Sequence, residues 1–439
     1  MAKPTIARCV AIAFYLADWR PKHMATQARR LFSSTQKWIR PLALRTHENF
    51  ATKPTLDQLE RFISMDVDFR QAVKTNNIKK VRLSRVLGRR SDKSLEWELP
   101  KIADVGELGR WLALSDNDLQ WLANLKGNSL RPNFKVSDHY VCTWIKKRST
   151  GYRLIESPKS LLKEVQRQIL DGLVSRIPTH DAAHGFCKGR SVVSFVQPHV
   201  RKRFCLKLDL KDFFPSVQFG RVWGLLRTAG YQKEVARYLA ALCTHSVDNK
   251  TLEEGIYFRG ADSADARSIY SPRHLPQGAP TSPALANLIA FRLDSRLSGL
   301  VDQISKSNRD SNVAYTRYAD DILISADDRV IATKRFAATV GAIALEEGFQ
   351  IHFRKTRLMT DSQQQLATGI VINQATNLAR TEFDRLKAIL HNCVKHGIDS
   401  QNRNSHPNFR EHLIGRIGWV ARLNPKKAAK LQALFDQIK

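Results

Sequence analysis

The sequence has 439 residues, of which 43% are hydrophobic and 26% are charged, and its formal net charge is +30. A chain of this length and composition can form two or three hydrophobic cores, which excludes wholesale disorder. So large a positive charge indicates a polyanionic partner, with nucleic acid as the leading candidate and an anionic membrane surface as the alternative. The early apolar run at 9–17 is much shorter than the ~20 residues that a membrane-spanning helix needs, so no membrane anchor is predicted.

The six cysteines are scattered, and no two of them stand in the C-x-x-C spacing of a zinc site. This distribution argues against structural zinc and against a disulfide framework, and it favours a cytosolic protein. The first 50 residues contain nine Lys or Arg and two acidic residues. Organellar transit peptides share this bias, so a transit peptide is the alternative for this segment.

Residues 1–130 are expected to form a basic, mainly helical N-terminal extension, because apolar residues recur at helical spacing in 56–72 and 104–125. The segment 29–45 mixes basic and apolar residues, which favours a basic helix or arm. A solvated charged face is the alternative for that segment. The sequence does not indicate the task of this extension.

The rest of the chain alternates between strand-like and helical patterns. Alternating residues between 140 and 155 surround a basic stretch and predict a hairpin, and apolar spacing predicts a helix over 161–174. Residues 248–273 are polar and rich in Gly, Ser and Asp, so we expect a surface insertion there. Helical patterns return at 381–396 and after 424–425, an Asn-Pro cap and first turn, so the chain should end in a small helical module.

Two adjacent acids, Asp320 and Asp321, interrupt a strand-like apolar run. A solvated turn would explain an isolated Asp-Asp pair, but a second strand-like run carries Asp209 at its centre. Carboxylates this close repel one another, and three of them from neighbouring strands make a set of hard oxygen ligands for Mg²⁺. Two such ions about 3.5–4 Å apart bind the attacking and leaving oxygens of an in-line phosphoryl transfer.

Three motifs around these acids occur in a fixed order. Asp209 is followed by Phe-Phe-Pro-Ser at 213–216, by Leu-Pro-Gln-Gly-Ala-Pro-Thr-Ser-Pro at 275–283 and by Tyr-Ala-Asp-Asp at 318–321. This set resembles the motifs of reverse transcriptases, and the bacterial, retron-type branch fits best. The resemblance covers roughly residues 131–425.

The resemblance implies a fold and an activity. The fold is an α+β right-hand polymerase with fingers, a palm with an antiparallel sheet, and a helical thumb. Residues 131–360 would form the fingers and palm, and residues 361–439 the thumb, a C-terminal helical region that contacts RNA. The activity is RNA-directed DNA synthesis from dNTPs with two Mg²⁺ ions, for which Mn²⁺ could substitute.

The resemblance also assigns the catalytic centre. Asp209, Asp320, Asp321 and the backbone carbonyl of Leu210 would hold the metal ions, and Lys355 would protonate the pyrophosphate leaving group. An ordinary exposed lysine is the alternative for Lys355.

Four further residues match positions that contact the incoming dNTP. Lys147 and Arg153 would clamp its triphosphate, and Gln277 would rest against its sugar and the template pair. Phe214 matches a steric gate, whose ring would collide with a 2′-OH. An ordinary basic surface hairpin is the alternative for Lys147 and Arg153.

The partners implied are a cognate structured non-coding RNA, its cDNA product and an effector protein, in a bacterial cytoplasmic enzyme of anti-phage defence with no membrane contact. His199, Thr368 and Gly369 match positions that hold the family's RNA. The sequence departs from the retron pattern at 195–196, Phe-Val in place of Asn-Ala, and at Ala367 in place of Val. These departures put the retron branch, but not the polymerase, in doubt.

Three alternatives stay open. An RNA-dependent RNA polymerase uses the same carboxylates, although Phe214 argues for deoxynucleotides. A non-catalytic RNA-binding scaffold would have lost turnover, but intact carboxylates near nucleic acid cost affinity unless metal ions lie between them. Another bacterial reverse transcriptase would differ in how it primes synthesis.

Overall fold

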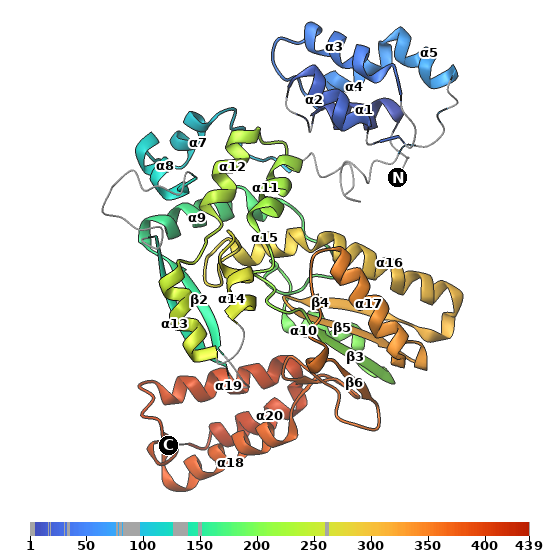
Figure 1. Ribbon diagram of the computed structural model, residues 1–439. Helices are drawn as coiled ribbons and strands as arrows, with labels where there is room; N and C mark the ends of the chain where they lie inside the picture. Colours follow the sequence, from blue (N-terminus) through green and yellow to red (C-terminus); the bar gives the residue numbers. More distant parts are fainter. Residues whose placement is uncertain are drawn as a thin grey trace. The chain divides into compact units, whose positions relative to one another are not determined.

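The computed structural model describes residues 5–15, 17, 19–29, 31–32, 36–75, 78, 81, 97–125, 139–147, 152–259 and 263–438 (Figure 1). The chain divides into two compact units. The first comprises Met1–Thr179 and Asp212–Arg292, and the second comprises His180–Lys211 and Leu293–Lys439.

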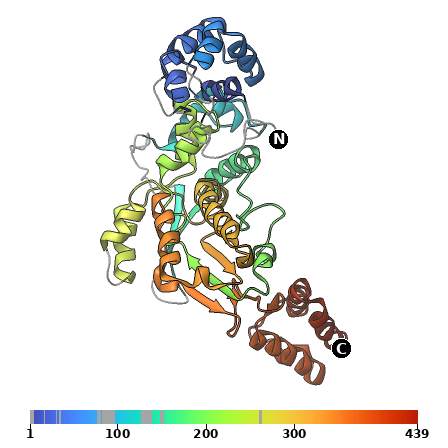
Figure 2. The ribbon, with the colours of Figure 1, turned by 90° about the vertical axis from the view of Figure 1, so that its right-hand side faces the viewer.

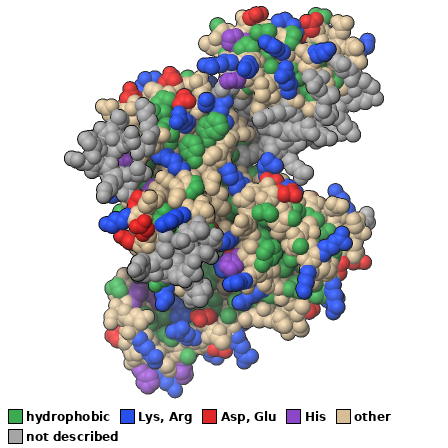
Figure 3. Space-filling view, in the orientation of Figure 1, with side chains coloured by type: hydrophobic (Ala, Val, Ile, Leu, Met, Phe, Trp, Pro, Cys, Tyr) green, Lys and Arg blue, Asp and Glu red, His purple; other side chains and the backbone are tan. Residues whose placement is uncertain are grey.

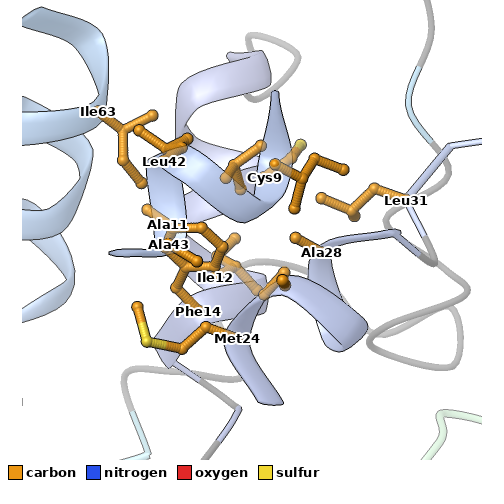
Figure 4. Close-up of a cluster of buried hydrophobic side chains, with 14 of the residues drawn as sticks. Cys9, Ala11, Ile12, Phe14, Met24, Ala28, Leu31, Leu42, Ala43 and Ile63 are labelled. Carbon is orange, nitrogen blue, oxygen red and sulfur yellow. The ribbon is translucent and has the colours of Figure 1, made fainter. Parts of the chain in front are cut away.

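The N-terminal helices of the first unit have a hydrophobic core of their own. They are α1 (Ile6–Tyr15), α2 (Pro21–Arg29), α3 (Ile39–Asn49), α4 (Leu56–Met65) and α5 (Val67–Thr75). Figure 4 shows side chains from the first four converging, and Ile12, Phe14, Leu42 and Ile63 are each 0% exposed. Helix α4 begins with a capping box between Thr55 and Gln58, which satisfies amide groups that a helix start leaves unpaired.

The remainder of the first unit contains a hairpin and several helices. The hairpin pairs β1 (Tyr140–Lys146) with β2 (Tyr152–Pro158), as the alternating pattern predicts, and its turn at 148–151 lies outside the described residues. The helices are α7 (Val105–Trp111), α8 (Asp116–Ala123), α9 (Ser160–Gly172), α11 (Phe219–Thr228), α12 (Lys233–Leu242), α13 (Asn249–Arg259), α14 (Ser263–Tyr270) and α15 (Ser282–Ile289).

At 248–273, where the sequence analysis expected a surface insertion, the structure forms helices α13 and α14, which the sequence analysis did not predict. Leu252, Ala266 and Tyr270 are buried in one cluster with Leu154 of β2. A few buried apolar residues therefore anchor a segment that is polar overall.

The second unit contains a four-stranded antiparallel sheet in the order β4-β5-β3-β6 (Figure 1). The strands are β3 (Phe204–Asp209), β4 (Ala314–Tyr318), β5 (Asp321–Ala326) and β6 (Arg357–Thr360). The helices α10 (Val192–Val196), α16 (Phe291–Ser307, from Leu293 on) and α17 (Lys334–Glu346) belong to the same unit. Ile322, Leu323 and Ile324 of β5 are each 0% exposed, so both faces of the strand are covered there and these three neighbours are all apolar.

The chain ends in a small sheet and three helices. The sheet contains β7 (Leu366–Ala367), β8 (Ile370–Val371) and β9 (Asn377–Leu378). Helices α18 (Arg380–His396), α19 (Phe409–Leu423) and α20 (Pro425–Phe435) share one apolar cluster and lie together in Figures 1 and 2. Helix α18 ends before Gly397 and α20 begins at Pro425 behind an Asn424 cap, as the sequence predicts. Within the described ranges, no helix is both long and apolar enough to cross a membrane.

Candidate active site

Three carboxylates lie at one end of the four-stranded sheet. Asp209 is the last residue of β3 and pairs directly with Asp321, the first residue of the antiparallel strand β5. Directly opposed residues in such a ladder have Cβ atoms about 4.5–5.5 Å apart on the same face. Asp320 lies in the two-residue turn between β4 and β5, and its carbonyl accepts a 2.8 Å hydrogen bond from the Leu210 amide. Residues more than 100 positions apart in the sequence are therefore joined at one end of the sheet.

Two of these carboxylates form ion pairs with lysines. The ammonium group of Lys355 lies 3.0 and 3.1 Å from the carboxylate oxygens of Asp209, and that of Lys207 lies 3.0 Å from Asp321 Oδ1. Burial raises the pKa of Asp321, Lys207 opposes that shift, and the neighbouring Asp209 adds to it. In this structure the two ammonium groups therefore balance the charges of Asp209 and Asp321.

The donor set fits a hard divalent cation, because carboxylate and carbonyl oxygens are the ligands that Mg²⁺ takes. In the described part of the chain, however, no three acidic, His or Cys side chains are already arranged around a common metal position. Asp209 and Asp321 are instead paired with lysine ammonium groups. Metal binding would thus require these ion pairs to rearrange.

The turn that carries Asp320 has a strained and crowded backbone. Ala319 has a φ of +55°, and positive φ at the first of two turn residues is the pattern of a type II′ hairpin, which glycine usually fills. A Cβ added to Gly185 would lie 2.7 Å from the Ala319 amide nitrogen. Only glycine at 185 lets the chain pass this close to the turn.

A buried arginine also forms a hydrogen bond with the backbone of this turn. Arg317 and Asp294 are both 0% exposed, and the guanidinium donates to the two carboxylate oxygens at 2.7 Å each. Arg317 Nη1 also donates to the Ala319 carbonyl at 2.9 Å, and the Tyr315 hydroxyl donates to Asp294 at 2.6 Å. Burial alone would lower the pKa of Arg317, but Asp294 raises it above its ordinary value, so the guanidinium stays charged. The sequence analysis missed this pair, although a charged residue within a buried strand was a signal for it.

Comparison with known proteins places these motifs in a family. Residues 145–383 match the reverse transcriptase (RNA-dependent DNA polymerase) family, which is more than half of the chain. The retron Mx162 reverse transcriptase of Myxococcus xanthus is 33% identical over 355 residues, which cover 77% of this chain and 68% of that protein. The chain belongs to the bacterial, retron-type reverse transcriptases.

Two further relatives carry the same description. The retron Mx65 reverse transcriptase of Myxococcus xanthus is 43% identical over 301 residues, covering 69% of this chain and 65% of that protein. The retron Ec86 reverse transcriptase of Escherichia coli is 30% identical over 289 residues, covering 65% of this chain and 76% of that protein. The match to the Mx65 enzyme thus spans slightly less than two thirds of its length. The predicted retron-type family is confirmed, despite the departures at 195–196 and Ala367.

His199 has a different place in this reverse transcriptase from the one expected. Its ring is 0% exposed and contacts a side chain of each of the paired strands β4 and β5, with Nδ1 2.7 Å from Ser325 Oγ and Nε2 2.8 Å from Thr316 Oγ1. Burial lowers the pKa of His199 to about 3, so the ring is neutral at pH 7. The prediction that His199 contacts RNA does not fit this geometry, because hydroxyl groups of the protein occupy both ring nitrogens. His199 instead connects two strands of the sheet.

Thr368 and Gly369 form the two-residue turn between β7 and β8. Their φ values of +45° and +83° are the pattern of a type I′ hairpin, which favours glycine at the second position. Gly369 is exposed. The Oγ1 atom of Thr368 is buried and has no hydrogen-bond partner among the residues that the structure describes.

The residues expected to contact the dNTP all belong to the first unit. Arg153 is exposed on β2, opposite Ile145, and Lys147 directly follows β1. Phe214 is half-buried, with its ring centroid 5.4 Å from that of Phe213.

Hydrogen bonds join three of these segments within the first unit. The Gln277 carbonyl accepts from the Glu156 amide of β2 at 2.9 Å, and the Leu275 amide donates to the Val217 carbonyl at 2.9 Å. A Cβ added to Gly278, whose φ is +138°, would lie 2.9 Å from the Glu156 carbonyl oxygen. The Gln277 loop is therefore attached to β2 and to the segment that follows Phe214.

The sequence analysis also missed a second buried network, which is built around Glu156, the β2 residue that is bonded to the Gln277 loop. The Glu156 carboxylate is 0% exposed and contacts His245 Nδ1 at 2.7 Å and His274 Nε2 at 3.0 Å. Burial would raise the pKa of Glu156, but His274 and His245 lower it to about 2, so it stays an anion. His274 Nδ1 also lies 2.8 Å from the Pro272 carbonyl oxygen, so both of its ring nitrogens have a partner. The contacts of Glu156 with the two histidines therefore stabilise the end of strand β2, to which the Gln277 loop is attached.

Proposed function

We propose that this protein is an RNA-directed DNA polymerase that copies one dedicated structured RNA. The observation that carries the proposal is the direct pairing of Asp209 with Asp321 beside the Asp320 turn. Membership of the retron-type family supports it. In this proposal the second unit supplies the palm and a helical thumb, and the β1–β2 hairpin of the first unit belongs to the fingers.

Asp209, Asp320, Asp321 and the Leu210 carbonyl would hold two Mg²⁺ ions, with Mn²⁺ as a substitute. When bound, these ions lower the pKa of the primer hydroxyl and neutralise charge on the triphosphate. The chain positions the reacting groups, and Lys355, whose side chain is 51% exposed, would donate a proton to the leaving pyrophosphate. Lys207 would leave Asp321 when the site is loaded.

The nucleotide is held by side chains of the first unit in this proposal. Lys147 and Arg153 screen its triphosphate, Gln277 contacts its sugar, and the Phe214 ring excludes a ribose 2′-OH. The carbonyl of Gln277 is already engaged by β2, so its side chain projects from a fixed backbone.

The test of this function replaces one carboxylate at a time. Asp320→Asn and Asp321→Asn should each reduce dNTP incorporation on an RNA template with a DNA primer by several orders of magnitude, since they remove charge that holds the ions. Asp361→Asn is a matched control, because Asp361 is an exposed acid of the same unit, 3.9 Å from Arg203. Equal activity in all three variants would exclude the aspartate pair from the reaction.

The proposed template is a structured non-coding RNA, and the proposed product is a single-stranded or branched, RNA-linked DNA. The names of the relatives support this choice. An effector protein and an anti-phage role complete the proposal. Cells that carry the gene and its flanking DNA should then resist phage more than cells that carry the Asp321→Asn variant.

A further inference from the structure

The charges of the N-terminal helices are divided between two sides. The acids of α4 and of the start of α5 are engaged in ion pairs. Asp57 and Glu60 contact Arg8 at 2.6 and 2.8 Å, and Asp66 contacts Arg45 at 2.8 Å. These acids therefore neutralise arginines within the helical cluster and are not available to balance charge elsewhere.

The side formed by α2 and the start of α3 carries only bases. Lys22, His23 and Arg29 are exposed along α2, Arg20 is exposed just before it, and Arg40 is exposed on α3. From Trp19 to His47 the described residues include no acid, and none of the four Lys or Arg named here has an ion pair to a described acid. Figure 3 shows Lys and Arg side chains on the surface of these helices.

Helices α2 and α3 both pack on the common core, so the charges that they carry have a fixed spacing. Helices α2 and α3 bury Met24, Ala28, Leu42 and Ala43 in the common core, which orients the opposite sides of both helices toward solvent. Four cations on two packed helices attract a polyanion, and releasing its condensed counterions supplies the binding free energy. A lone charged helix would lack this fixed spacing.

We infer that the exposed bases of α2 and α3, with Arg20, form an RNA-binding surface that contacts the phosphate backbone. We define this α2–α3 surface by Arg20, Lys22, Arg29 and Arg40. It lies outside residues 145–383, which match the reverse transcriptase family, so the surface adds an RNA contact to the polymerase. The choice of RNA as the polyanion rests on the proposed function. The surface recognises charge and spacing, and not base sequence.

The test compares two triple variants of the full chain that lose the same charge. Lys22→Gln/Arg29→Gln/Arg40→Gln alters the α2–α3 surface. Arg61→Gln/Arg70→Gln/Lys74→Gln is the control, because these three exposed bases lie on α4 and α5 beside the acids.

The probe is a fluorescent transcript of the non-coding DNA that flanks the gene, titrated at several KCl concentrations from 50 to 300 mM. The surface variant should lower the slope of log Kd against log salt by about 2–3, one unit or slightly less for each lost phosphate contact. The control variant should keep the wild-type slope. Circular dichroism of both variants checks that the helices remain folded.

Two results would overturn the inference: equal salt slopes for the two variants, or a difference between them in binding to vesicles with 30% anionic lipid but not in binding to the RNA. The last result would identify a lipid surface as the partner. Incorporation by the wild-type enzyme on an external RNA template and DNA primer is measured separately. Its absence would contradict the proposed polymerase function, while the two salt slopes would still decide the binding surface.

Discussion

Arg317 and Asp294 form a fully buried bidentate ion pair, and the same guanidinium donates to the carbonyl of Ala319, next to Asp320. Because Ala319 has positive φ, the turn needs external contacts to keep this conformation. The pair therefore couples the buried interior of the sheet to the position of Asp320.

The first prediction is that Arg317→Lys impairs catalysis. Lysine keeps the charge opposite Asp294, but its single ammonium group cannot reproduce three donor contacts in a fixed plane. We expect kcat for dNTP incorporation to fall about tenfold or more, as for a small misplacement of a reacting group, with a smaller change in the dNTP KM.

Tyr315→Phe is the matched control for this prediction. It removes a hydrogen bond to the same Asp294 carboxylate without touching the turn, so it should lower stability by about 1.5–3 kcal/mol and leave kcat close to wild type. Equal losses of kcat in both variants would assign the pair to stability alone. Urea unfolding and steady-state kinetics on the same preparations separate the two effects.

The second prediction concerns His199 and pH. The pKa of His199 is about 3 in the folded chain, against an ordinary value of 6.5. Below pH 6.5 the unfolded chain therefore binds a proton that the folded chain does not bind until the pH approaches 3. This difference leaves stability unaffected above pH 6.5 and reduces it as pH falls from 6.5 toward 3. Between pH 7 and pH 5 the contribution should be about 2 kcal/mol.

The measurement is the change in the free energy of unfolding between pH 7 and pH 5, for wild type and for His199→Gln. Glutamine cannot titrate, so the variant should show a pH-dependent loss smaller by about 2 kcal/mol, whatever its absolute stability. His391→Gln is the control, since His391 lies on α18 outside the four-stranded sheet. An unchanged pH dependence in His199→Gln would mean that the ring is accessible to protons in the folded state.

The sequence predicted those parts of the site that are encoded locally. Asp320 and Asp321 are adjacent, and the alternation around Asp209 indicated a strand, so their meeting at the end of an antiparallel sheet followed from pattern and resemblance. The Glu156–His274 contact joins residues 118 positions apart, and nothing in either neighbourhood indicates the partner. Such contacts depend on the tertiary fold.

His199 shows the limit of a positional match. Its place in the family's motif suggested a contact with RNA, but exposure is not encoded at a single position. The apolar residues Phe195 and Val196 are 1% and 0% exposed and end helix α10, and the turn that follows places His199 against the sheet. The same property explains why helices α13 and α14 were missed, since only their few buried residues decide how they fold.

The third prediction concerns sugar selection by Phe214. If its ring excludes a ribose 2′-OH, Phe214→Ala should increase ribonucleotide incorporation relative to deoxynucleotide, and Phe214→Val should do so less. Phe213→Leu is the control, because Phe213 is the neighbouring ring, 4% exposed, and its loss affects packing. The ratio of kcat/KM for dNTP and rNTP is the measurement. Unchanged ratios in both Phe214 variants would favour an RNA polymerase.

The last prediction assigns the choice of RNA to the β7–β8 turn. The Thr368 hydroxyl is buried without a partner among the described residues, and leaving a hydroxyl unpaired costs about 1–3 kcal/mol unless a ligand engages it. We expect Thr368→Val, which keeps the shape but removes the hydroxyl, to reduce branched DNA made from the cognate RNA more than synthesis on an external primer. Thr376→Val is the control, because that hydroxyl donates to the Leu423 carbonyl next to the same small sheet.

Nucleic acid isolated from cells that carry the gene and its flanking DNA is treated with ribonuclease and debranching enzyme, and its mobility is compared between variants. If Thr368→Val yields as much branched DNA as wild type, or if only heterogeneous unbranched DNA is found, RNA choice does not reside in this hydroxyl, and priming by another route becomes the better description of the enzyme.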